Sequence, residues 1–114
     1  MATRFLALLI LIGGTAAAAA ASDDDLRKQI VGAWGETAEC TGAVLTFNAD
    51  GSFSTTDKSQ ANPEVHNGTY QISAGKLTGQ LEQQAMPEVT LRFDGTTMYL
   101  DAQGGPTDKL ARCN

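Results

Sequence analysis

Residues 88–101 read EVTLRFDGTTMYLD, and this stretch carries the clearest structural signal of the 114-residue chain. Hydrophobic and polar residues alternate in its first half, so Val89, Leu91 and Phe93 point to one face of an extended strand. Asp94-Gly95 is a two-residue hairpin turn, after which a second strand returns. The stretch therefore predicts an antiparallel hairpin with one buried face.

The same plan of strand, short turn and strand recurs through the rest of the chain, with a longer loop over residues 57–66. The alternation predicts eight short strands, over residues 30–35, 43–47, 52–56, 69–73, 76–81, 88–93, 97–101 and 109–113. Successive hairpins favour an up-and-down order, and closing the sheet removes exposed strand edges. We therefore expect an all-β fold, a small eight-stranded antiparallel up-and-down barrel with one short N-terminal helical turn.

The inward positions of these strands form the expected core. They are Trp34, Leu45, Phe47, Phe53, Tyr70, Ile72, Leu77, Leu81, Val89, Leu91, Phe93, Met98, Leu100 and Leu110. An eight-stranded barrel is only wide enough to be filled by side chains or to hold one small ligand. Strands this short, with residues this bulky, argue against a roomy lipid cavity.

Residues 1–21 have the three-part pattern of a secretory signal peptide. Arg4 precedes a short apolar run, and a stretch of alanines then offers cleavage sites. The run is shorter than the roughly 20 residues that a membrane span needs. We expect cleavage after Ala21, a secreted or periplasmic protein, and no stable membrane span in the mature chain. The expected plan is a signal peptide at 1–21, an acidic N-terminal segment at 22–29 and the barrel at 30–114.

The chain is acidic, with 8 Lys+Arg against 13 Asp+Glu and a formal net charge of −5. Removal of Arg4 with the leader would make the net charge −6, from 7 basic and 13 acidic residues. Nucleic-acid binding needs a basic face, so this class is excluded. Asp23-Asp24-Asp25 and the following bases suit one helical turn, and we expect the acidic segment to be solvated rather than a cation site.

Cys40 and Cys113 both follow the expected cleavage site. In an oxidising compartment, an even pair of cysteines in a small domain predicts a disulfide. The bridge would close a loop 73 positions long, worth roughly 4 kcal/mol on the chain-entropy model. Two cysteines and one distant histidine make a poor zinc set, so no metal is expected.

Gly32-Ala33-Trp34 lies on the first strand and Arg112 on the last. This arrangement resembles the lipocalin and lipocalin-like barrels, in which a first-strand Trp closes the barrel floor beneath an Arg from the far end. The resemblance implies that Gly32, Trp34 and Arg112 close one end, by cation–π stacking of guanidinium on indole, while the other end stays open.

The sequence is also similar in design to periplasmic inhibitors of secreted zinc proteases. These are small, signal-bearing eight-stranded barrels in which Gly-x-Trp is followed shortly by Cys, and here Cys40 follows Trp34 by six positions. In that family the N-terminal segment enters the protease active site. This similarity implies the same role for residues 22–29.

The chain carries no recognisable catalytic set. His66, the single histidine, is expected in an exposed loop without a nucleophile or co-ligands. Neither a nucleophile elbow nor a phosphate loop is present. We therefore expect a protein that is not an enzyme and that needs no cofactor.

The expected function is that of a monomeric, secreted or periplasmic binding module for a small apolar ligand or an envelope partner. Contacts to the ligand or partner are expected from Tyr70, Met98, Pro63 and His66, because binding residues concentrate at the open end and its loops. Two alternatives stay open. One is a periplasmic protease inhibitor acting through residues 22–29, and the other is a structural envelope protein without a small ligand.

Overall fold

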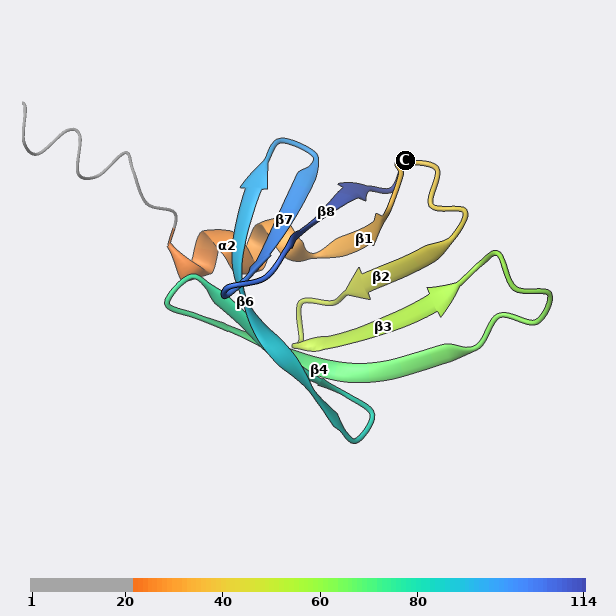
Figure 1. The fold of residues 1–114 in the computed structure, drawn as a ribbon, viewed down its shortest axis with the longest axis horizontal. Coiled ribbons are helices and arrows are strands. Elements are labelled where there is room, and N and C mark those ends of the chain that lie inside the picture. The colour runs from red at the N-terminus through yellow and green to blue at the C-terminus, as the bar shows by residue number, and fades with distance from the viewer. Residues whose placement is uncertain (1–21) are drawn as a thin grey trace, which may run out of the picture.

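A computed structural model describes residues 22–114, and the signal peptide expected at 1–21 lies outside them. The described chain folds into a closed barrel of eight antiparallel strands, each hydrogen-bonded to its neighbours in sequence order (Figure 1). The elements are α2 (Asp23–Ile30), β1 (Gly32–Gly35), β2 (Ala43–Phe47), β3 (Ser52–Asp57), β4 (Val65–Ser73), β5 (Lys76–Leu81), β6 (Gln84–Asp94), β7 (Thr97–Ala102) and β8 (Thr107–Arg112). The predicted up-and-down barrel is confirmed.

The barrel closes where the first strand meets the last. Trp34 pairs with Arg112 and Gly35 with Ala111, which joins β1 to β8. All other pairings link strands that are consecutive in the chain. The two ends of the domain therefore lie side by side at this seam.

The predicted strand boundaries are wrong for the middle of the chain. β4 begins at Val65 rather than at residue 69, and β6 begins at Gln84 rather than at residue 88. His66, expected in a loop, lies in β4 opposite Thr55. The polar start of β4 has little strand pattern of its own, and backbone pairing with β3 decides its conformation.

The N-terminal segment forms two turns of helix rather than one, and Ile30 ends this helix instead of beginning the first strand. Ser22 is the N-cap, since its hydroxyl accepts a hydrogen bond from the Asp25 amide at 3.1 Å. Leu26 and Ile30 are four residues apart on one face and both are buried. The segment expected to be a solvated tail therefore packs its apolar face against the barrel.

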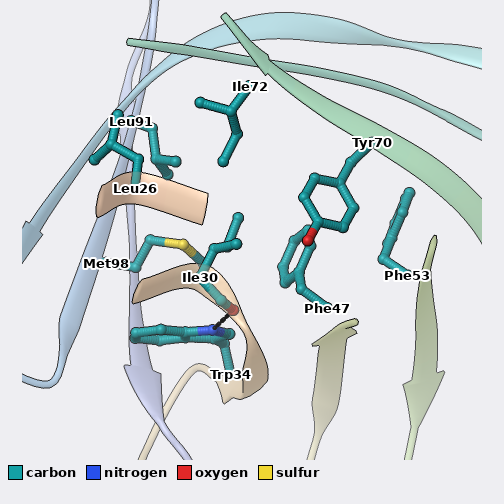
Figure 2. Close-up of a cluster of buried hydrophobic side chains, with 9 residues drawn as sticks. All are labelled: Leu26, Ile30, Trp34, Phe47, Phe53, Tyr70, Ile72, Leu91 and Met98. Carbon is teal, nitrogen blue, oxygen red and sulfur yellow. Dashed lines mark hydrogen bonds between the residues drawn. The ribbon is translucent and has the colours of Figure 1, made fainter. Parts of the chain in front are cut away.

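The core has two adjoining parts (Figure 2). Beside α2 the cluster consists of Leu26, Ile30, Trp34, Ile72, Leu91 and Met98, and next to it lie the rings of Phe47, Phe53 and Tyr70. Every residue of the predicted core except Val89 belongs to this cluster or packs against it. The prediction missed the helix residues Leu26 and Ile30, and also Val44 on β2.

No helix within residues 22–114 has the length and apolar character needed to cross a membrane.

Candidate functional site

One end of the barrel is closed by contacts between α2 and two side chains at the seam. Trp34 Nε1 donates to the Ile30 carbonyl at 2.8 Å. Arg112 donates from Nη1 to the Val31 carbonyl at 2.9 Å and from Nη2 to the Gln29 carbonyl. Carbonyls at a helix C-terminus have no hydrogen-bond donor within the helix. Trp34 and Arg112 supply the missing donors for α2. The Arg112 guanidinium also lies 4.2 Å from the centroid of the Trp34 ring.

Gly32 makes room for this arrangement. Its φ is +128°, and a methyl group at this position would lie 2.5 Å from Nη1 of Arg112. Any other residue would be strained and would displace the guanidinium. The structure thus brings Gly32, Trp34 and Arg112 together at the end covered by α2.

Two charged side chains fasten α2 to the β4–β5 hairpin. The carboxylate of Asp23 accepts hydrogen bonds from the amides of Ala74 and Gly75, both at 2.9 Å. These hydrogen bonds lower the pKa of the Asp23 carboxyl, and the bond from the Gly75 amide has the largest effect. Arg27 donates to the Ile72 carbonyl at 2.8 Å. The helix is therefore held by directional bonds as well as by its buried face.

The remaining interior contains a cavity of about 230 Å³. It is lined by Leu45, Phe47, Phe53, Tyr70, Leu77, Thr78, Gly79, Met86, Pro87, Val89, Leu100, Ala102 and Asp108. No described residue of α2 reaches it, nor do Trp34 or Met98. An apolar cavity of about 150 Å³ already accepts benzene, so this one has room for a somewhat larger ligand.

A glycine and a strand irregularity shape the cavity wall. Gly79 pairs with Tyr70, and a methyl group at Gly79 would lie 2.7 Å from the Thr69 carbonyl oxygen. The register between β5 and β6 then shifts between Leu77 and Gly79, which gives β6 one extra residue. Met86 and Pro87 consequently both line the cavity although they are adjacent in sequence. Pro87 fits such a bulge because it has no amide hydrogen for the ladder.

Tyr70, one of the four residues predicted to contact a ligand, forms part of the cavity wall. Its hydroxyl donates to the Asn48 carbonyl at 2.6 Å. Burial, with a smaller contribution from the nearby Asp50 carboxylate, raises the pKa of this hydroxyl. The ring meets Phe47 edge to face at a centroid distance of 5.1 Å. Tyr70 therefore presents a fixed aromatic surface to the cavity, with its polar group already satisfied.

His66 lies at the rim of the barrel, in a second hollow lined by Ala43, Thr55, Thr56, Asp57, Gln60, Asn62, Glu64 and His66. Its Nδ1 is 3.2 Å from a carboxylate oxygen of Glu82, and its Nε2 is 3.6 Å from one of Glu64. Asp57 lines the same hollow. Hydrogen bonds from the Ser59 hydroxyl, which has the larger effect, and from the Ser59 amide lower the pKa of the Asp57 carboxyl. The rim is thus rich in carboxylates.

The other two expected contact residues do not line the cavity. Pro63 is exposed in the loop between β3 and β4. Met98 is fully buried beside Ile30 and Trp34, at the closed end (Figure 2). Met98 points inward from β7 but packs in the core cluster with Ile30 and Trp34 instead of lining the cavity. Of the four predicted contacts, Tyr70 alone lines the cavity, and His66 lines the separate hollow at the rim of the barrel.

The structure places a disulfide between Cys40 and Cys113, with a Cα–Cα distance of 5.7 Å. It joins the β1–β2 connection to the chain just after β8, beside the seam. Within residues 22–114, no three His, Cys, Asp or Glu side chains are grouped so that they could hold a metal ion.

Asp108 also lines the cavity, and its inward position is predictable from the sequence. The alternation that places Leu110 and Arg112 on one face also places Asp108 there, two positions earlier. Met86 and Pro87 offered no such signal, because the bulge that turns them inward depends on the pairing of β5 with β6.

The chain matches no protein family, no curated protein and no solved structure. The likeness to lipocalin-like barrels therefore rests on the closed eight-stranded, antiparallel architecture itself.

Proposed function

We propose that this protein is a secreted or periplasmic, lipocalin-like and non-catalytic binding protein that takes one small apolar ligand into the barrel. The observation that carries the proposal is the division of the interior. Side chains of α2 and the adjacent strands fill the interior beside the helix, while mainly apolar groups that α2 does not reach surround about 230 Å³ of space. Binding pockets for small molecules have this character, with a mainly apolar wall and few polar groups.

The disulfide supports the compartment, because such bonds persist in oxidising environments. The inhibitor hypothesis has less support, since its active segment is the helix that closes the barrel. Releasing residues 22–29 would expose Leu26 and break the bonds made by Asp23 and Arg27. A ligand site in the cavity needs no such rearrangement.

The size of the cavity sets the strength of binding. A compact ligand that buries about 200 Å² of apolar surface gains about 5 kcal/mol at about 25 cal/mol/Å². That gain corresponds to a Kd in the range of about 0.1–1 mM. A purely apolar probe is therefore expected to bind weakly but saturably.

The test uses 1-naphthalenemethanol as the probe and the methyl NMR signals of Leu45, Leu77 and Leu100 as reporters. We expect saturable shifts in the wild-type protein. Val89→Phe should abolish them, because Val89 lines the cavity and the larger ring would fill it. Val65→Phe is the matched control, since Val65 is 61% exposed and does not line the cavity. Unsaturable shifts, or equal binding by both variants, would refute the site.

A further inference from the structure

The apolar cavity has one charged side chain in its wall, and that side chain is a carboxylate. Asp108 pairs with Leu100 across β7 and β8, and the next inward pair along the same ladder is Leu110 with Met98. Asp108 therefore lies on the inward-facing side of β8, where it lines the cavity among aliphatic and aromatic groups. Its side chain is exposed rather than sealed in the core.

The described chain does not supply a positive partner for Asp108. Ion pairs within residues 22–114 join Arg27 to Asp24, His66 to Glu64 and Glu82, Lys76 to Glu88, and Arg92 to Asp101. None of them includes Asp108. Its neighbour Lys109 pairs with Tyr99 and so occupies the opposite face of the strand.

Carboxylates also lie at the rim of the barrel, outside the cavity. A separate hollow there, which shares no lining residue with the cavity, contributes Asp57 and Glu64, and Glu82 lies beside His66. Among the described residues, neither the cavity nor this hollow is lined by a lysine or an arginine. A carboxylate beside an apolar wall of low dielectric constant, such as Asp108, attracts cations and repels anions more strongly than it would in water.

We propose that the occupant of the cavity is a small cationic amphiphile, with an apolar body about the size of two fused rings and an ammonium group held by Asp108. The apolar body would displace water from the wall formed by Leu45, Phe53 and Val89. The ammonium would donate to the Asp108 carboxylate in a charge-assisted hydrogen bond. This inference rests on the proposed function and specifies the chemical class of its ligand.

The test compares three probes with one ring system and different charges, namely 1-naphthylmethylammonium, 1-naphthalenemethanol and 1-naphthoate, by calorimetric titration at neutral pH. We expect the cation to bind about tenfold more tightly than the alcohol, as one charge-assisted bond allows. The anion should bind less tightly than the alcohol. The preference for the cation should decrease with added salt.

Asp108→Asn separates the wall carboxylate from the general charge of the protein. In this variant the cation should bind no more tightly than the alcohol, and binding of the alcohol should stay unchanged. Glu36→Gln is the matched control, since it removes one exposed negative charge from the β1–β2 connection without lining the cavity. This control should keep the full preference for the cation.

The outcomes distinguish this inference from the function on which it rests. Binding of the alcohol without any preference for the cation would overturn the inference and leave the cavity site intact. An undiminished preference in Asp108→Asn would overturn the assignment to Asp108. Failure of all three probes to bind would overturn the cavity site and the inference together.

Discussion

Replacing Ile30 with alanine tests whether α2 is an integral part of the barrel. The Ile30 side chain is fully buried next to Trp34 and Met98 (Figure 2). Truncation removes all carbons beyond Cβ, which is worth about 2.4 kcal/mol at about 0.8 kcal/mol for each buried methylene. The cavity left behind adds to this loss. We therefore expect the free energy of unfolding to fall by about 3 kcal/mol, as is typical of such substitutions.

The assay is urea unfolding followed by the fluorescence of Trp34, the one tryptophan of the chain. With a slope of about 1.5 kcal/mol per molar urea, the midpoint should fall by about 2 M. Lys28→Ala is the control, because Lys28 is exposed on the same helix, and it should shift the midpoint by less than about 0.3 M. Equal midpoints for the two variants would mean that α2 is not docked, and the reasoning about the closed end would be wrong.

Three further predictions concern the features that hold the fold. Reducing the disulfide should lower the free energy of unfolding by about 4 kcal/mol, measured as the difference between urea midpoints with and without reductant. Gly32→Ala should cost about 1–3 kcal/mol because of its positive φ and the close approach of the guanidinium, whereas Gly42→Ala, which meets no neighbour, should be neutral in the same assay. Asp23 has a lowered pKa through its bonds to Gly75 and Ala74, so its contribution is present above about pH 4 and is lost as the pH falls through the lowered value. The urea midpoints of the wild type and Asp23→Asn should therefore converge as the solution is acidified; a constant difference between them would contradict this linkage.

The barrel could be predicted because its determinants are local. The alternation of Val89, Leu91 and Phe93 and the turn at Asp94-Gly95 fix one hairpin, and the other hairpins repeat this pattern. The packing of α2 against the barrel could not be predicted from the local sequence pattern. Leu26 and Ile30 are only two apolar residues in a charged segment, and their burial depends on a surface that exists only after the barrel closes.

The candidate site was predictable only in part, for related reasons. Tyr70 and Asp108 follow from alternation along β4 and β8. Met86 and Pro87 enter the wall through a register shift between two strands, which neither strand encodes alone. His66 was misplaced because the ladder with β3 extends β4 beyond its own hydrophobic pattern.

The seam between β1 and β8 has a consequence for the order of folding. Its two residue pairs form the shortest ladder of the barrel and the one that joins segments farthest apart in the chain. Each hairpin closes a short loop, whereas the seam closes almost the whole domain, and the entropy of loop closure grows with loop length. We expect the seam to form last, after the hairpins have assembled into an open sheet. In an unfolded chain that retains its disulfide, the segments of β1 and β8 are already held near each other. If the disulfide forms before folding, pairing of these two strands no longer requires closure of a long loop.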